Sequence, residues 1–116
     1  MKVVKNVAAQ GEMLIRRVNE FDDRPTQDMA PEGAVYIIAH SETGHHHVID
    51  REKVSVKEVT NAPEGLGILQ MIVKEPTEVK HLREYDTHES LMLGKGLWEV
   101  RLQREYTPEG YRRVAD

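Results

Sequence analysis

Histidines are the residues whose type and spacing in this sequence could support chemistry. The chain has six histidines, and four of them, His40, His45, His46 and His47, lie in one short segment. A neutral imidazole ring is the commonest metal ligand among side chains, and it binds zinc at about 2.0–2.1 Å. The chain has no cysteine, so a transition-metal site would depend on nitrogen and oxygen ligands. The sequence therefore predicts a histidine-based metal site in this segment.

The residues around these histidines are predicted to form a β-hairpin. Apolar residues precede and follow Ser41-Glu42-Thr43-Gly44, a polar stretch of a length that is common in hairpin loops. With this loop, His40 pairs with His45, and the alternation of side chains puts His47 on the same face as both. Paired Cβ atoms lie about 4.5–5.5 Å apart, close enough for three imidazoles to reach one ion. His40, His45 and His47 are therefore predicted metal ligands.

The same register defines the neighbours of His47. It pairs Ile38 with His47 and Tyr36 with Ile49, and it places His46 on the opposite face, where we do not expect a ligand. A shift of one residue would exchange the two faces. The alternative interpretation of the segment is a run of solvated histidines on a turn, with no metal.

A fourth ligand is predicted from a distant part of the chain. His88 lies in the polar segment Asp86–Ser90, ahead of an apolar run, and is the histidine best placed to complete the site. His81 lies among charged residues and is assigned to the surface. With nitrogen ligands and no thiolate, zinc is the first expectation, while iron, nickel and manganese stay open. Four protein ligands would make a closed site, and three would leave a position for water or dioxygen.

The strands that must position these residues are predicted from apolar alternation. Segments Lys53–Val59 and Leu97–Arg104 alternate as half-buried strands do. Continuous apolar runs at Ala34–Ala39 and Ile68–Val73 predict central strands, and Met13–Ile15 predicts another. In the segment Leu97–Arg104 an apolar face is set against a polar one: Trp98, Val100 and Leu102 against Glu99, Arg101 and Gln103.

Proline and glycine turn signals separate these strands at short intervals. This pattern favours an all-β fold, a small antiparallel sandwich or jelly-roll-like barrel of about 7–9 short strands. Asn19–Glu32 is the longest polar connection and is predicted to be a solvated acidic loop. Ala8–Arg17 has some helical character, but its neighbours favour a strand. The chain of 116 residues is predicted to be a single β domain, 1–116.

Composition argues against several classes of protein. The net charge of −4 disfavours a nucleic-acid binder, because such proteins are usually basic. No apolar stretch approaches the ~18 residues of a membrane helix, and the first residues lack the apolar core of a signal peptide. The sequence contains no Gly-x-Ser-x-Gly nucleophile motif and no phosphate-binding glycine loop. We therefore expect a soluble protein that does not bind membranes.

The spacing of the histidines resembles the metal motif of cupins. That motif has a His-x-His pair, a Glu a few residues later and a distant His on another strand. In this sequence His45, His47, Glu52 and His88 would take those places. The resemblance implies a small jelly-roll fold that holds a metal ion.

A closer resemblance covers the chain from about Gln10 to Asp116 and links it to a family of short, uncharacterised phage and bacterial proteins. The shared pieces are Gln10-Gly11-Glu12, His40, Thr43-Gly44-His45-x-His47, His88, Gly96, Gln103-Arg104-Glu105-Tyr106-Thr107-Pro108-Glu109 and Arg113-Val114-Ala115-Asp116. The resemblance brings no known reaction with it. It implies an association with phage or prophage, and a location in the cytoplasm of a bacterial host cell or in the virion.

Two functions follow as hypotheses. The first is a phage-related β domain that binds a transition metal through His40, His45, His47 and His88, with the reaction left open. The second is a non-enzymatic accessory or interaction module without a functional metal, which binds a protein partner or a second copy of itself. In the second case the acidic segment from Glu20 to Glu32 would face a basic partner.

Overall fold

The computed structural model describes residues 2–10, 12–39, 46–82, 90–107 and 110–113, and at positions 81, 82, 104–107 and 110–113 it describes the backbone alone. The described residues form twelve strands, and none of them is helical. Within these ranges there is accordingly no helix long and apolar enough to cross a membrane. The predicted all-β fold is confirmed.

The first of two sheets carries the histidine strand. Its order is β1-β10-β9-β6-β5, and neighbouring strands are antiparallel except for β1 and β10, which are parallel. The strands are β1 (Lys2–Val4), β10 (Leu91–Leu93), β9 (Thr77–Leu82), β6 (His46–Asp50) and β5 (Val35–Ala39). In this sheet β6 lies between β9 and β5, so both of its edges are paired.

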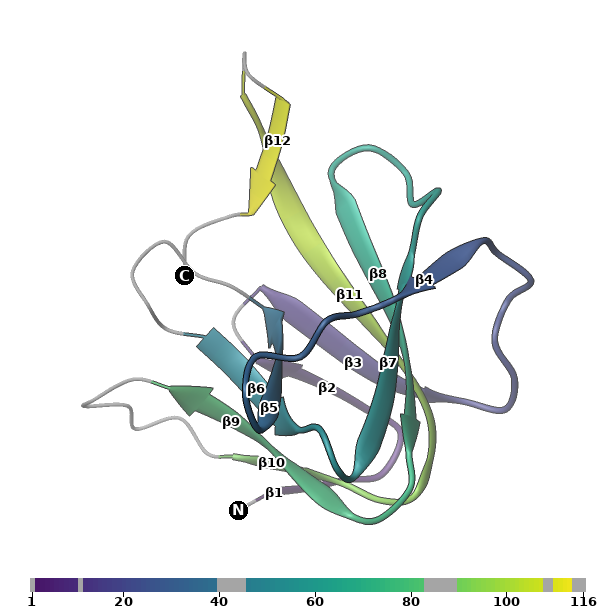
Figure 1. Cartoon of the computed structure of the whole chain (residues 1–116), viewed down its shortest axis with the longest axis vertical. Coiled ribbons are helices and arrows are strands. Elements are labelled where there is room, and N and C mark those ends of the chain that lie inside the picture. The colour runs from purple at the N-terminus through teal and green to yellow at the C-terminus, as the bar shows by residue number, and fades with distance from the viewer. Residues whose placement is uncertain (1, 11, 40–45, 83–89, 108–109, 114–116) are drawn as a thin grey trace.

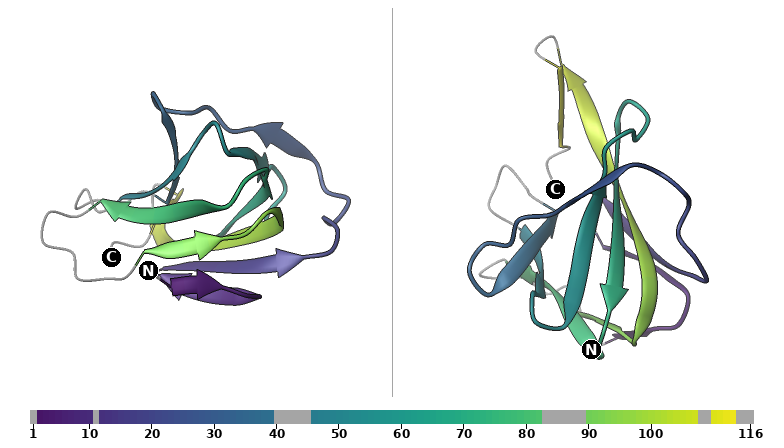
Figure 2. Two further views of the ribbon diagram at one scale, coloured as in Figure 1. Left: turned by 90° about the horizontal axis from the view of Figure 1, so that it is seen from below. Right: turned by 45° about the vertical axis from the view of Figure 1, so that its right-hand side comes forward.

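The second sheet is wholly antiparallel and has the order β2-β3-β11-β8-β7-β4, with β12 paired to β11. The two sheets face each other as a sandwich, and the chain crosses between them several times (Figures 1 and 2). The strands are β2 (Val7–Gln10), β3 (Met13–Val18), β11 (Gly96–Thr107), β8 (Leu66–Val73), β7 (Val54–Val59), β4 (Thr26–Asp28) and β12 (Gly110–Arg113).

The core lies between the sheets and follows the predicted alternation. Trp98, Val100 and Leu102 of β11 all point into it, as do Ile15 of β3 and Ile49 of β6. Because side chains alternate along a strand, every second residue of these strands packs inward and removes apolar surface from water. The strands predicted at Ala34–Ala39, Lys53–Val59, Ile68–Val73 and Leu97–Arg104 are therefore present as β5, β7, β8 and β11.

The prediction for Asn19–Glu32 was incomplete. The segment contains β4, which pairs with β7 through Thr26 opposite Val59, and Glu32 forms an isolated bridge with Val35. The residues of β4 show no apolar alternation, so no sequence pattern marked this strand. It is an edge strand, and backbone hydrogen bonds to β7 hold it in place. Short strands of this kind also explain why the structure has more strands than the sequence predicted.

One end of the core is closed by an arginine stacked on the single tryptophan. The guanidinium carbon of Arg17 lies 4.4 Å from the centroid of the Trp98 ring, and Arg17 also donates to the carbonyl of Lys95 at 3.0 Å. The indole Nε1 of Trp98 donates to the carbonyl of Gly94 at 2.9 Å. Gly96 has φ +145°, and a Cβ there would lie 2.6 Å from Nη1 of Arg17, so glycine suits both the backbone and the space.

Candidate metal centre

His47 is a histidine buried between the two sheets. It is the second residue of β6 and is only 2% exposed. Alternation along β6 puts it on the same face as Ile49, which belongs to the core. The neighbouring His46 is partly exposed and lies on the other face of the strand. The predicted division between His46 and His47 is therefore confirmed for the described residues.

The ring of His47 has a close partner from the opposite sheet. Its Nδ1 lies 2.6 Å from Oε1 of Gln10, the last residue of β2, which is 7% exposed. An amide oxygen can only accept a hydrogen bond, so in this pair Nδ1 carries the proton. In the neutral ring Nε2 then holds the lone pair, which is the form that binds metals.

The predicted pairing of Ile38 with His47 is wrong. Tyr36 does lie opposite Ile49, as predicted, but the register shifts between Ile37 and Ala39, and Ala39 lies opposite His47. The shift is a β-bulge, in which two residues of one strand face a single residue of the other. The small side chain of Ala39 thus stands beside the imidazole of His47.

A second histidine position adjoins His47 through the backbone of β9. The register pairs His47 with His81, and His46 with Leu82. The charged residues that flank His81 predict a surface position for its side chain. The structure gives the backbone register of residue 81 and not its side chain, so that assignment stays a prediction.

The other predicted ligands, His40, His45 and His88, lie outside the described residues. Glu52, which the cupin-like motif would include, is exposed in the turn between β6 and β7, where its backbone N–H donates to Asp50 Oδ1 at 2.9 Å. Asp50, the last residue of β6, is already about 10 Å along the strand from His47, and Glu52 lies beyond it. The structure therefore does not bring Glu52 to that histidine. Within the described ranges, no three His, Cys, Asp or Glu residues are grouped as a metal site.

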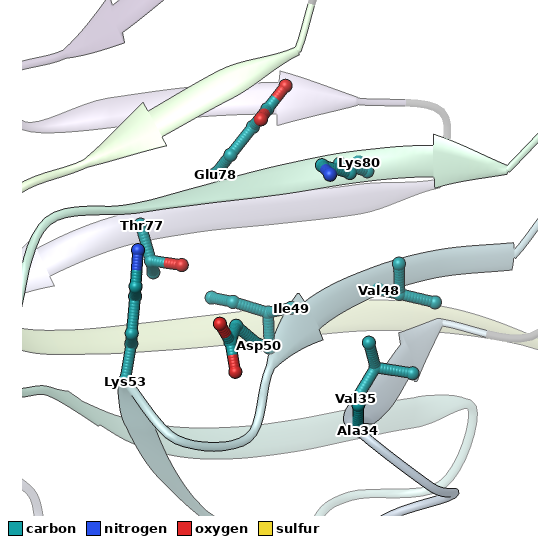
Figure 3. A pocket seen from close by; sticks show the side chains of 9 residues that line it. All are labelled: Ala34, Val35, Val48, Ile49, Asp50, Lys53, Thr77, Glu78 and Lys80. Carbon is teal, nitrogen blue, oxygen red and sulfur yellow. The ribbon is translucent and has the colours of Figure 1, made fainter.

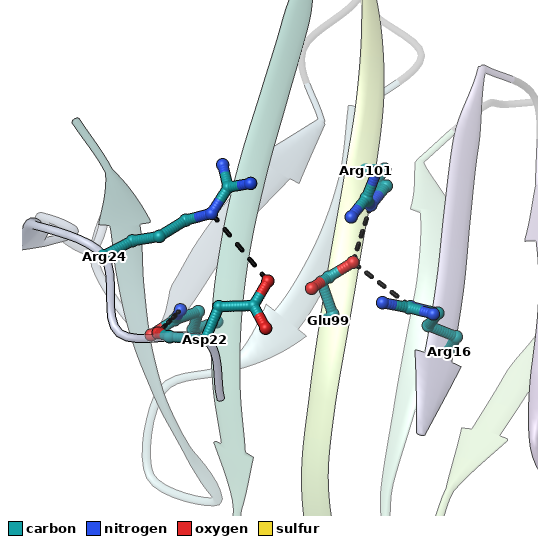
Figure 4. A network of polar contacts seen from close by, with 6 residues as sticks. Arg16, Asp22, Arg24, Glu99 and Arg101 are labelled. Atoms are coloured by element: carbon teal, nitrogen blue, oxygen red, sulfur yellow. Dashed lines mark hydrogen bonds and ion pairs between the residues drawn. The ribbon is translucent and has the colours of Figure 1, made fainter. Parts of the chain in front are cut away.

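A buried carboxylate on the second sheet is a separate polar centre. Oε1 of Glu99 accepts from Nε of Arg101 at 2.6 Å and from Nε of Arg16 at 3.2 Å. Figure 4 shows the two arginines converging on Glu99 from β11 and β3. The sequence placed Glu99 on the polar face of its strand, opposite the apolar face, but the residue is only 5% exposed. Its burial depends on neighbours from distant strands, which no local pattern reveals.

The charge state of Glu99 follows from these contacts. Burial on its own would raise the pKa of the carboxyl, but hydrogen bonds and positive charge from Arg101 and Arg16 outweigh burial and lower the pKa below its usual value. The group is therefore ionised at neutral pH. It stabilises the sheet as an anion and is a poor candidate for a general acid.

Replacing Glu99 by Gln is expected to destabilise the fold in a pH-dependent way. Because the folded pKa is lowered, the ionised carboxylate contributes stability above the unfolded pKa, near 4.3, and this contribution is lost as pH falls through the folded value. At pH 7 we expect Glu99→Gln to lose about 1–2 kcal/mol, since both arginines are partly exposed and water screens their charges. The measurement is urea unfolding of both proteins from pH 7 to pH 3. A difference that stays constant over that range would contradict the assignment.

A shallow hollow near the start of β9 is another candidate for binding. It has a volume of about 250 Å³, and its polar lining consists of Asp50, Lys53, Thr77, Glu78 and Lys80 (Figure 3). The two acids and two lysines balance in charge, so the hollow does not select an ion of either sign. Among the residues whose side chains the structure describes, no histidine lines it. The buried His47 therefore remains the stronger basis for a site.

Comparisons with known proteins place the chain in a family without assigning it a reaction. A family model described as "Domain of unknown function (DUF8820)" matches residues 9–103. The matched region contains Gln10, the histidine segment and Glu99. A search of curated proteins gave no match, and neither did a search of solved structures.

Proposed function

We propose that this chain, which belongs to the DUF8820 family, binds one transition-metal ion through its histidines. His47 is the ligand anchored in the sandwich, and His40, His45 and His88 are the further ligands. The proposal is carried by one observation, the buried ring of His47 whose Nδ1 is held by Gln10 Oε1. In metal-bound histidines, the N–H of the second ring nitrogen usually donates a hydrogen bond to an oxygen acceptor in this way.

The surroundings of His47 support this proposal. The bulge at Ile38–Ala39 is of the kind that re-aims side chains next to functional sites. The register also brings His81 to the position opposite His47, which adds another histidine to the neighbourhood. Zinc is the first metal to test, because the ligands are nitrogens and no thiolate is present. An ion with an open coordination position could activate water or dioxygen, and this would make the domain an enzyme.

The metal content of the purified protein tests the proposal. We expect about one transition-metal ion per chain, removed by a strong chelator and restored by adding zinc, as for a mononuclear histidine site. The double variant with His45→Ala and His47→Ala is expected to hold no metal after the same treatment. Elemental analysis measures the ion, and circular dichroism of each protein verifies that the fold is retained.

Two results would contradict the proposal. One is wild-type protein that takes up no zinc, iron, nickel or manganese after chelation. The other is a folded double variant that retains its full metal content, because the ion would then be bound elsewhere on the chain.

A second candidate function is a non-enzymatic phage accessory or interaction module, which has no functional metal and binds a protein partner or a second copy of itself. Its support is the exposure of apolar side chains on two edge strands, Val3 of β1 and Val7 of β2. An unprotected edge can accept another strand. Purified protein that lacks metal and forms a stable complex would favour this function.

A further inference from the structure

We infer that Gln10 positions His47 for metal binding by holding its ring in the tautomer that leaves Nε2 free of a proton. The inference rests on the proposed function. Gln10 ends β2 of the second sheet, and His47 is the second residue of β6 in the first sheet, so the contact joins the two layers of the sandwich. The 2.6 Å between Nδ1 and Oε1 is within hydrogen-bonding distance.

Gln10 is an unusual residue at its position. It lies on the inner face of β2 together with Ala8, and it pairs with Met13, which is 1% exposed. Burying an amide without a hydrogen-bond partner costs on the order of 1–3 kcal/mol, so an apolar residue would suit this place better if packing were its only role. The hydrogen bond to His47 offsets part of the cost of burying the amide group of Gln10.

The tautomer is the property that the bond controls. A neutral imidazole carries its proton on Nδ1 or on Nε2, and only the unprotonated nitrogen can bind a metal. Because Oε1 accepts from Nδ1, the lone pair is on Nε2, on the side of the ring turned away from Gln10. The same bond restrains rotation of the ring, which fixes the direction in which Nε2 approaches an ion.

Three variants separate positioning from core packing. Gln10→Leu removes the acceptor and keeps the size of the side chain. Gln10→Glu keeps a strong acceptor for Nδ1 and tests rescue. Gln70→Leu is the matched control, because Gln70 is also a buried glutamine in a strand, but it donates to the carbonyl of Asp22 and its register partner in β11 is Glu99.

The first readout is the tautomer of His47 in metal-free protein at pH 8, measured from the ¹⁵N chemical shifts of the ring. We expect the proton on Nδ1 in the wild type, in Gln10→Glu and in Gln70→Leu. In Gln10→Leu we expect a mixture of the two tautomers. A purely structural role of Gln10 would not change this equilibrium in step with metal affinity.

The second readout is zinc affinity, measured by competition with a chelating dye. We expect Gln10→Leu to weaken binding about 10–100-fold, which is the usual effect of losing such a supporting bond. Gln10→Glu should bind at least as tightly as the wild type, and Gln70→Leu should match the wild type within a few-fold.

The outcomes separate this inference from the proposed function. Wild-type protein that binds no metal overturns both. Wild-type protein that binds zinc with its His47 proton on Nε2 overturns the role of Gln10 alone. The same holds if Gln10→Leu binds zinc as tightly as Gln70→Leu. If Gln10→Leu does not fold, Gln10→Glu decides, because a 10-fold weaker affinity in that variant contradicts the role of the acceptor.

Discussion

Changing His47 to Ala is expected to weaken zinc binding about 100-fold or more, whereas changing His46 to Ala should alter it only within a few-fold. His47 is buried beside the core and is fixed by Gln10, while His46 lies on the other face of β6 and is partly exposed. Loss of a ligand should exceed the 10–100-fold effect that loss of a supporting residue produces. The two substitutions are chemically identical and adjacent, so each is the control for the other.

Competition with a chelating dye measures both affinities on the same scale. A reversed ranking would show that His46 is the ligand and that the metal sits on the outer face of the sheet. Equal and negligible effects would favour the solvated histidine run. Thermal unfolding of the metal-free variants separates loss of binding from loss of fold, because a buried imidazole contributes packing that an exposed one does not.

The histidine hairpin shows what the sequence could predict and where prediction stopped. Two of its features agree with the sequence prediction: Tyr36 pairs with Ile49, and His46 and His47 lie on opposite faces of the strand. The bulge was not predictable, because Ile38 and Ala39 are both apolar and both lie in the core. Nothing in the local pattern marks which of two apolar residues is the extra one.

Long-range contacts are the second limit. The hydrogen-bonded residues Gln10 and His47 are 37 positions apart in the chain, and the ion pair Arg16–Glu99 joins residues 83 positions apart. Local periodicity describes one strand at a time and contains no information on which strands become neighbours. The sequence therefore indicated that His47 lies on a strand with other histidines, but it could not indicate that a glutamine supports it.

Backbone pairing is the third limit. The strands β1 and β4 have only three residues each, and β4 has no apolar side chain. Edge strands of this length are held by hydrogen bonds to a neighbour, so their formation depends on the sheet beside them. The longer strands β8 and β11 bury alternating apolar residues where their side chains are described, and this is why the strands were recognisable from the sequence.

Trp98→Ala is expected to cause the largest loss of stability of any single substitution considered for this chain, about 3–5 kcal/mol. The side chain is fully buried, its Nε1 donates to the carbonyl of Gly94, and Arg17 stacks on its ring. Truncation leaves a cavity at the end of the core and removes the cation–π contact between the indole ring and the guanidinium group of Arg17. Trp98→Phe keeps an aromatic ring for Arg17 but loses the hydrogen bond, so we expect a smaller loss of about 1–3 kcal/mol.

Urea unfolding followed by far-ultraviolet circular dichroism measures these losses, because Trp98 is the only tryptophan and its removal abolishes tryptophan fluorescence. A loss below about 1 kcal/mol for Trp98→Ala would contradict the closed core end.

Zinc affinity provides a second test. Trp98 lies near the start of β11, opposite Arg17 of β3. Gln10 of β2 is opposite Met13 of β3, and Met13 is in turn opposite Leu102 of β11. Four residues of strand separate the two levels by about 13 Å. Trp98→Phe should therefore lower the stability of the fold without weakening the binding of zinc by the folded protein.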